Sequence, residues 1–257
     1  MPQVCGDFKG FRLMPKFTAI AVIPARLGST RLARKVLREI AGKPMVGWVY
    51  ESARKSPLLA DVIIATDSDE VMQVAEAYGW KAQMTASSHR SGTDRMHEVS
   101  QRVAADVYVN IQGDLPSVRP EHIEALLKPM QRPEVMVSTI QVLCRPEEIS
   151  NPNAVKVVTD KNGRALYFSR STIPFDRDKT GAIQYFKHLG IYAYRKPALD
   201  RFCALPESKL EAAERLEQLR LLENGIDIYV AETPFNTVEV DTEDDLLRVQ
   251  EMFKSPG

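Results

Sequence analysis

Short apolar, β-rich runs alternate with segments of helical period from Thr18 to Val142, and this alternation limits the possible folds more than any other feature. Strands buried on both faces read as continuous apolar runs, and their alternation with helices favours a parallel sheet covered by helices. The expected strands are Ala19–Ile23, Val62–Thr66, Ala82–Thr85, Val107–Ile111 and Met136–Val142; the expected helices are Met45–Lys55, Asp69–Tyr78, Thr93–Val103 and Glu121–Met130. The sequence therefore predicts a three-layer, Rossmann-like α/β fold with a mostly parallel sheet and helices on both faces.

The pattern becomes more antiparallel after Asn151. An Asn162-Gly163 turn separates two short β-rich runs, which is typical of a hairpin. The expected elements are hairpin strands at Val155–Thr159 and Ala165–Ser169, a strand at Tyr185–Tyr194, an amphipathic helix at Lys209–Glu223, a strand at Ile226–Ala231 and a closing helix at Thr242–Phe253. We interpret residues 1–17 as an N-terminal extension and residues 18–257 as a single domain, in which residues 151–205 form a smaller β-rich sub-lobe.

The composition excludes several classes of protein. Lysine plus arginine and aspartate plus glutamate each number 34, so no net charge attracts the chain to nucleic acid or to an anionic membrane. The three cysteines are widely spaced, which argues against a disulfide framework or a structural zinc site and favours a reducing cytoplasm. No apolar stretch approaches the roughly 20 residues that a membrane span needs.

A basic loop follows the first predicted strand. It carries four cations within ten residues, Arg26, Arg31, Arg34 and Lys35, together with Gly28, Ser29 and Thr30. In open α/β sheets ligands bind beyond the carboxyl ends of the strands, and such a loop can wrap a triphosphate. It matches neither GxGxxG nor GxxxxGK[ST], which disfavours a dinucleotide fold and a P-loop. The plainer interpretation is a solvated charged loop, but the otherwise neutral chain favours phosphate binding.

Several motifs together resemble the 3-deoxy-manno-octulosonate (Kdo) cytidylyltransferase family. They are Ile23-Pro-Ala-Arg-Leu-Gly-Ser-Thr-Arg-Leu32, His89-Arg-Ser-Gly-Thr-Asp-Arg95, Val109-Asn-Ile-Gln-Gly-Asp114, Asn153-Ala-Val-Lys-Val-Val158, Tyr167-Phe-Ser-Arg170, His188-Leu-Gly-Ile-Tyr192 and Leu216-Glu-Gln-Leu-Arg220. The resemblance implies transfer of CMP: the anomeric hydroxyl of Kdo attacks the α-phosphorus of CTP, pyrophosphate leaves, and CMP-Kdo feeds lipopolysaccharide assembly. It also implies a homodimer.

The resemblance implies a Mg²⁺ cofactor held by Asp114 and Asp241. Magnesium prefers hard oxygen ligands, few of them from protein. Asp241 precedes Thr242-Glu-Asp-Asp245, which looks like a capping box, so a capping role is the alternative for Asp241 and the one we assign to Asp244 and Asp245.

The same resemblance assigns the substrate contacts. Arg26 and Lys35 would hold the triphosphate and, with the two aspartates, form the catalytic set; Ser29 and Arg31 would assist. Ser91, Gly92 and Thr93 would lie beside the cytosine, although an N-cap for the following helix explains them equally well. Gln112, Arg170, His188, Tyr192, Glu217 and Gln218 correspond to sugar-contacting positions, with Arg170 suited to the sugar carboxylate. Taken singly, these six are also consistent with structural roles.

Two stretches depart from the family pattern. Ala33-Arg34 replaces a proline and a glycine in the basic loop, and Leu115 replaces a glutamate next to Asp114, where a lost carboxylate could weaken metal binding. Two other functions stay open. One is a cytidylyltransferase for another acidic sugar, such as an amino-Kdo or a sialic-type sugar, and the other is a catalytically silent nucleotide-binding protein.

Overall fold

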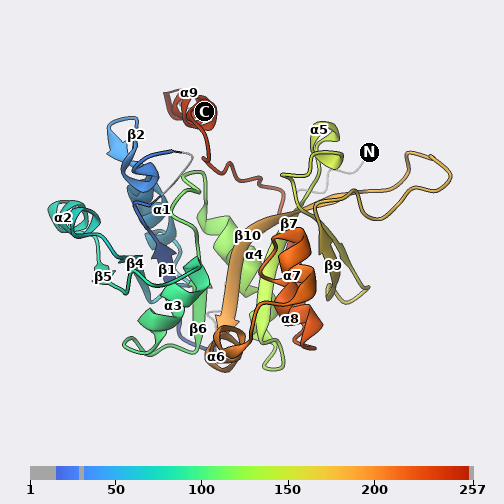
Figure 1. Ribbon diagram of the computed structural model, residues 1–257, viewed down its shortest axis with the longest axis horizontal. Helices are drawn as coiled ribbons and strands as arrows, with labels where there is room; N and C mark the ends of the chain where they lie inside the picture. Colours follow the sequence, from blue (N-terminus) through green and yellow to red (C-terminus); the bar gives the residue numbers. More distant parts are fainter. Residues whose placement is uncertain (1–15, 29–31, 255–257) are drawn as a thin grey trace, which may run out of the picture.

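The computed structural model describes residues 16–28 and 32–254, which are built around one mixed sheet (Figure 1). The strands of the sheet lie in the order β11-β7-β10-β6-β1-β4-β5. Their bounds are β1 Ala19–Pro24, β4 Asp61–Thr66, β5 Ala82–Met84, β6 Val107–Asn110, β7 Val137–Leu143, β10 Phe186–Arg195 and β11 Ile228–Glu232. Strand β1 pairs in parallel with β4 and β6, and β11 pairs in parallel with β7. Only β10 runs against its neighbours in this order, so the predicted mostly parallel sheet is confirmed.

Helices cover both faces of the sheet because successive residues of each buried strand point to opposite sides. In β1, Ala21 and Ile23 belong to one hydrophobic cluster, and Ile20 and Val22 belong to another. The first cluster includes residues of α1 (Met45–Arg54), α2 (Asp69–Ala77) and α4 (Pro120–Leu127). The second includes residues of α3 (Gly92–Ser100), α6 (Lys196–Ala204) and α8 (Leu219–Glu223). Figure 1 shows these helices in front of and behind the sheet, which confirms the three-layer fold.

The predicted hairpin is formed by β8 (Lys156–Thr159) and β9 (Ala165–Ser169), which pair antiparallel. Gly163 in the turn has φ +76°, a conformation that glycine adopts without steric cost. Strand β8 also pairs with the beginning of β10, which attaches the hairpin to the main sheet. The segment 151–205 therefore contributes both the hairpin and, through β10, a strand in the middle of the main sheet.

The single helix predicted over Lys209–Glu223 is wrong. The structure has two short helices, α7 (Lys209–Glu214) and α8, with Arg215 between them in the left-handed region at φ +55°. The apolar spacing of a helix continues through the break, but Glu217 there accepts a hydrogen bond from Thr93 of α3. A contact with a distant part of the chain thus accompanies the break, and sequence periodicity does not show such contacts.

The closing helix α9 (Glu243–Lys254) packs on α1 and on the small antiparallel pair β2 (Glu39–Ile40) and β3 (Lys43–Pro44). Its Phe253 ring lies 4.6 Å from that of Trp48, centroid to centroid. The remaining elements are α5 (Pro146–Ile149) and the 3₁₀ turns η1 (Lys35–Leu37) and η2 (Pro129–Gln131). Within residues 16–28 and 32–254, every helix is too short or too polar to cross a bilayer.

Buried His122 connects the start of α4 to the segment after β11 by two hydrogen bonds. Its Nδ1 accepts a hydrogen bond from the Arg119 backbone N–H at 3.0 Å, so Nε2 carries the proton that is donated to the Phe235 carbonyl at 2.9 Å. Burial lowers the pKa of this imidazole below its ordinary value of 6.5. The folded protein therefore holds His122 neutral at pH values where the unfolded chain would bind a proton.

We expect His122 to make stability depend on pH. Its contribution is fully present above pH 6.5 and is lost as the pH falls below that value, by at most about 1.4 kcal/mol per pH unit. The free energy of unfolding, measured by urea titration between pH 7.5 and pH 5, should fall less steeply in His122→Gln than in the wild type. Equal pH dependence of the two proteins would contradict this role.

Candidate functional site

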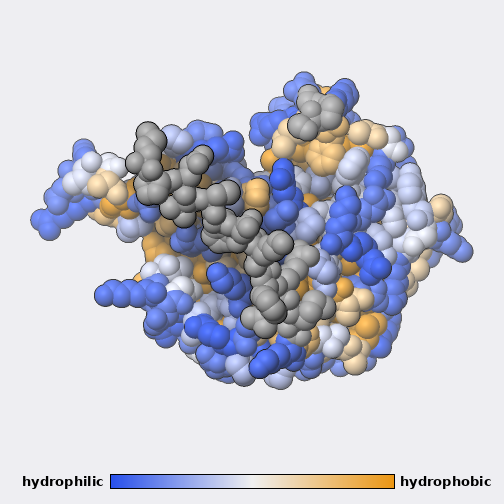
Figure 2. Space-filling view, turned by 180° about the vertical axis from the view of Figure 1, so that it is seen from behind, coloured by the Kyte–Doolittle hydropathy of each residue, from blue (hydrophilic) through white to orange (hydrophobic). Residues whose placement is uncertain are grey.

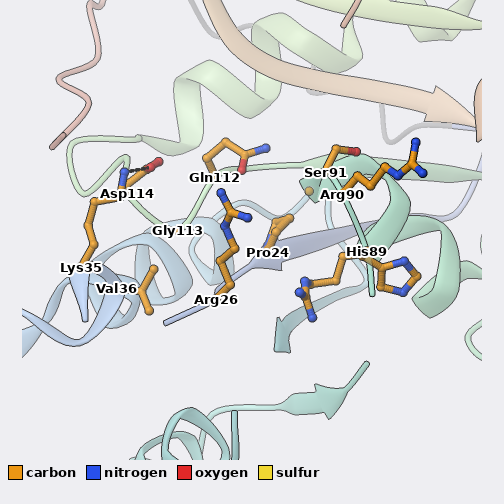
Figure 3. A pocket seen from close by; sticks show the side chains of 12 residues that line it. Pro24, Arg26, Lys35, Val36, His89, Arg90, Ser91, Gln112, Gly113 and Asp114 are labelled. Carbon is orange, nitrogen blue, oxygen red and sulfur yellow. Dashed lines mark hydrogen bonds and ion pairs between the residues drawn. The ribbon is translucent and has the colours of Figure 1, made fainter. Parts of the chain in front are cut away.

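A pocket opens at the carboxyl ends of β1 and β6, where an α/β sheet is expected to bind its ligand (Figure 3). Gly113 allows the two strand ends to approach closely, because a Cβ atom there would lie 2.9 Å from the Pro24 carbonyl oxygen. The pocket is lined by Pro24, Arg26, Lys35, Val36, His89, Arg90, Ser91, Gly92, Arg95, Gln112, Gly113 and Asp114. It combines residues from the basic loop, from the first turn of α3 and from the segment after β6.

The cations of the basic loop take different positions. Arg26 reaches into the pocket and Lys35 lines it beside Asp114 (Figure 3). Arg34 has a left-handed backbone, and its exposed side chain forms an ion pair with Glu70 of α2 instead of lining the pocket. Ser29 and Arg31, predicted to assist in phosphate binding, lie outside the described residues. Among the described loop residues, Arg26 and Lys35 are thus the cations available to an anion in the pocket.

Lys35 joins the two predicted metal aspartates. Its ammonium lies 2.5 Å from Oδ2 of Asp114 and 2.9 Å from Oδ1 of Asp241. Burial acts to lower the pKa of Lys35, but the two carboxylates outweigh it and raise the pKa above its ordinary value. Lys35 therefore stays positively charged at neutral pH, next to two acids from distant parts of the chain.

A third carboxylate, Glu239, joins this group. Ligand oxygens of Asp114, Glu239 and Asp241 all lie within 4.8 Å of one another. The Oδ1 atom of Asp114 is buried and has no hydrogen-bond partner, so a hard cation could use it as a ligand. Glu239, two residues before Asp241, was not predicted from the sequence as a site residue. The three acids are a donor set that suits Mg²⁺.

The neighbouring acids in the closing helix have a capping role. Oδ2 of Asp245 accepts hydrogen bonds from the backbone N–H groups of Asp241 and Thr242 and from the Thr242 hydroxyl. Asp244 is exposed in the first turn of α9. Asp241 is oriented differently, because its carboxylate faces Lys35 and the pocket residue Asp114.

The first turn of α3 forms one wall of the pocket. Ser91 is the N-cap, and it forms a capping box in which its hydroxyl and the carboxylate of Asp94 each accept the other residue's N–H. Ser91 and Gly92 line the pocket, and a Cβ atom on Gly92 would lie 3.0 Å from Oε1 of Gln112. The capping and pocket roles thus both apply to Ser91. Thr93 is fully buried and is absent from the pocket lining.

Arg95 also lines the pocket, although the sequence did not predict it as a site residue. Its side chain is almost fully buried and donates to Oδ2 of Asp67 at 2.8 Å and to the Thr85 hydroxyl at 2.5 Å. These contacts hold the guanidinium against the sheet beside the first turn of α3.

Most of the predicted sugar-contacting residues lie together next to this pocket. Gln112 lines the pocket and donates to Asn110, Asn110 donates to Thr93, and Thr93 donates to Glu217. The rings of His188, Tyr192 and Tyr194 lie in series at centroid distances of 5.3 and 5.8 Å, the first pair tilted by 52° and the second stacked. Three buried polar atoms in this region have no hydrogen-bond partner: the hydroxyls of Tyr192 and Tyr194 and Nε2 of Gln218. Asn110 and Tyr194 were not singled out in the sequence.

His188 is buried and electrically neutral. Its Nε2 lies 2.9 Å from the Thr139 hydroxyl, which itself donates to the Ile191 carbonyl. The imidazole is therefore the donor in this contact. Burial lowers the pKa of His188 to about 3. This side chain thus serves as a fixed neutral group at physiological pH.

Arg170 lies at the edge of this region. Its guanidinium donates to the carbonyls of Glu214 at 2.7 Å, Pro152 at 3.1 Å and Arg215 at 3.4 Å. The buried ammonium of Lys156 donates to the Arg170 carbonyl. These contacts fix Arg170 beside the break between α7 and α8. Glu217, two residues after Arg215, lies in the same break and contacts Thr93.

Comparison with known proteins supports the family resemblance that the sequence motifs suggest. The relative from Koribacter versatilis, named 3-deoxy-manno-octulosonate cytidylyltransferase, is 65% identical over 237 residues, covering 92% of this chain and 90% of the relative. The protein of the same name from Acidobacterium capsulatum is 60% identical over 240 residues, covering 93% and 98%.

A solved structure of CMP:2-keto-3-deoxy-manno-octonic acid synthetase complexed with CTP superposes with a TM-score of 0.89 at 46% identity, covering 92% of this chain and 98% of that one. A putative glucose-1-phosphate thymidylyltransferase from Bacillus anthracis shares the fold, with a TM-score of 0.66 at 14% identity. The cytidylyltransferase family model matches residues 20–228. The chain therefore belongs to the cytidylyltransferase family of nucleotidyltransferases.

Proposed function

We propose that this protein transfers CMP from CTP to the anomeric hydroxyl of Kdo, releasing pyrophosphate and giving CMP-Kdo for lipopolysaccharide synthesis. The observation that carries the proposal is a pocket lined by four basic side chains and by Asp114, which gathers with two further carboxylates, next to a buried polar group with unused hydrogen-bonding atoms. Such a site suits a triphosphate and a polyhydroxylated acid side by side. The names of the two bacterial relatives and of the solved structure with CTP support the choice of these substrates.

The nucleotide half of the site supplies positive charge where phosphates need it. Phosphoryl transfer depends chiefly on in-line positioning and charge neutralisation. Arg26 and Lys35 reach the pocket from one side, and the first turn of α3 presents backbone N–H groups from the other. We assign the triphosphate to Arg26 and Lys35, with Ser29 and Arg31, and the cytosine to the edge formed by Ser91 and Gly92.

Asp114 and Asp241, with Glu239 beside them, would hold the Mg²⁺ that the family implies. A bound magnesium ion would neutralise charge on the phosphates. Lys35 forms ion pairs with two of these carboxylates, Asp114 and Asp241. These ion pairs would place its ammonium next to the leaving phosphate.

The acceptor half of the site offers groups that match a sugar acid. The unpartnered hydroxyls of Tyr192 and Tyr194 and the amide of Gln218 can bond to sugar hydroxyls, which removes the cost of leaving them buried and unsatisfied. Arg170 at the edge is suited to the sugar carboxylate. His188 is neutral, so its imidazole can form a hydrogen bond with a sugar hydroxyl without adding a positive charge to the site.

A substrate matrix tests the proposal directly. The four common nucleoside triphosphates are each combined with Kdo, an amino-Kdo and a sialic-type sugar in the presence of Mg²⁺, and pyrophosphate is measured. We expect release only with CTP, and fastest with Kdo. Faster release with another acidic sugar would reassign the acceptor, and binding of CTP without release in any combination would favour a silent nucleotide-binding protein.

The metal assignment predicts the effect of removing one carboxylate charge. Asp114→Asn should lower turnover by about 100-fold or more and weaken Mn²⁺ binding, measured by electron paramagnetic resonance of the free ion, because a first-coordination oxygen anion is lost. Asp244→Asn makes the same charge change on the exposed side of α9 and should leave both quantities unchanged. Wild-type Mn²⁺ affinity in Asp114→Asn would remove this residue from the metal site.

We also infer a homodimer. Beyond β9, residues 170–185 form a projection that extends away from the sheet (Figure 1), and from behind it shows apolar side chains among charged ones (Figure 2). Leu143, Leu166 and Phe175 are large apolar side chains that remain exposed in this part of the molecule, with Phe175 82% exposed. An apolar side chain as exposed as Phe175 on a projection is what an interface between two chains would cover.

Light scattering should give a mass twice that of the chain. Phe175→Glu should shift the mass toward that of the monomer, because a charge would have to be buried. Leu247→Glu, a matched change on the exposed face of α9, should leave the dimer intact. A monomer mass for the wild type would refute the dimer.

We place the reaction in the cytoplasm, with no nucleic acid or membrane as a partner. The balanced charge of 34 basic and 34 acidic residues supports this choice. Cys144 and Cys203 are free thiols, which a reducing compartment preserves.

A further inference from the structure

Thr93 sits between the two halves of the proposed site. It is the second residue of α3, directly after Ser91 and Gly92, which line the nucleotide pocket. Its own side chain is fully buried and points away from that pocket, toward the loop between α7 and α8. Although it belongs to the segment assigned to the cytosine, its hydroxyl contacts a residue of the acceptor half.

The hydrogen bonds around Thr93 have a defined direction. Nδ2 of Asn110 donates to the Thr93 oxygen at 3.2 Å, so the single hydroxyl proton is available for Oε1 of Glu217, 2.6 Å away. The amide of Asn110 is oriented in turn by Nε2 of Gln112, which donates to its Oδ1 at 3.1 Å. The series thus runs from Gln112 in the pocket to Glu217 in the acceptor region.

The orientation of the Glu217 side chain depends on this hydrogen bond, because Glu217 lies outside any helix or strand. It lies in the break between α7 and α8, after Arg215 with its left-handed backbone. Its carboxyl group lies near the hydroxyls of Tyr192 and Tyr194 and helps to raise the pKa of both, and the Tyr194 hydroxyl also lies near Thr93. Burial raises the pKa of the Glu217 carboxyl group, and the hydrogen bond from Thr93 sets which way this group faces.

The start of α3 is also tightly packed on the nucleotide side. A Cβ atom on Gly92 would lie 3.0 Å from Gln112 and 3.1 Å from Pro24, so this turn cannot move without moving its neighbours. This packing holds the backbone of the neighbouring Thr93 in place, so its hydroxyl has a fixed origin.

We propose that Thr93 is a positioning residue for the acceptor sugar: its hydroxyl orients Glu217. The inference rests on the proposed function, since it assumes that Glu217 contacts the acceptor. It assigns Thr93 to sugar binding and leaves reading of the cytosine edge to Ser91 and Gly92.

The test compares Thr93→Val, which removes the hydroxyl and keeps the shape, with Thr93→Ser, which keeps the hydroxyl. Loss of this buried hydrogen bond predicts a rise in the KM for Kdo of up to about tenfold in Thr93→Val. The Kd for CTP, measured calorimetrically without sugar, should not change, and Thr93→Ser should resemble the wild type. If Thr93→Val does not fold, the smaller Thr93→Ala replaces it. It should likewise raise the KM for Kdo and leave the CTP Kd unchanged.

A double-mutant cycle with Glu217→Gln shows whether Thr93 acts through Glu217. If it does, Thr93→Val should have little further effect on the KM for Kdo once Glu217 is replaced. Additive effects, or a weakened CTP Kd with an unchanged KM for Kdo, would overturn the inference. Failure of the proposed function is distinct, because the wild type itself would then release no pyrophosphate from CTP and Kdo.

Discussion

The ion pairs of Lys35 with Asp114 and Asp241 hold the site together. They join the basic loop after β1, the segment after β6 and the segment before α9. These three parts are far apart in the sequence, so local interactions alone would not bring them together. Because the ammonium is partly buried, the loss of either carboxylate would leave a charge with reduced solvation, which is costly. The neighbouring packing supports the same arrangement, since Leu32 from the loop lies in one cluster with Leu246 and Val249 of α9. The basic loop is therefore fixed at its far end by charge and by apolar contact.

Beyond this charged edge, the acceptor region is built differently. It has few charges and many oriented dipoles: Asn110 and Thr93 form a directed series, and His188 is kept neutral by burial. Buried hydroxyls without partners lower the stability of the folded chain, and under the proposed function the sugar would satisfy those of Tyr192 and Tyr194. The contrast between the two halves follows their proposed ligands, since a triphosphate needs charge whereas a sugar needs directed hydrogen bonds.

Sequence reasoning predicted the fold well because its strongest signals are local. Strand β1 and helix α1 were found within one residue of their ends, from a continuous apolar run and from helical spacing. The helix over Lys209–Glu223 was predicted wrongly because its break is accompanied by a contact with Thr93, and β10 gave no sign that it enters the middle of the sheet. For the site, only the family resemblance paired Asp114 with Asp241. The direction in which Thr93 points depends on tertiary contacts, which no motif contains.

Leu115 shows why a departure from a family pattern has to be judged in three dimensions. A leucine in place of an acid next to Asp114 suggests from sequence alone that the metal site has lost a ligand. In the structure Leu115 is 5% exposed and packs in the same apolar cluster as Val36 and Val118, so the residue at this position faces the core. An ionised carboxylate would be unfavourable there without a partner. The acid that does adjoin Asp114 and Asp241 is Glu239, which comes from a different part of the chain. The number of carboxylates that gather beside Lys35 is thus a property of the assembled site, and the replacement at position 115 does not reduce it to two.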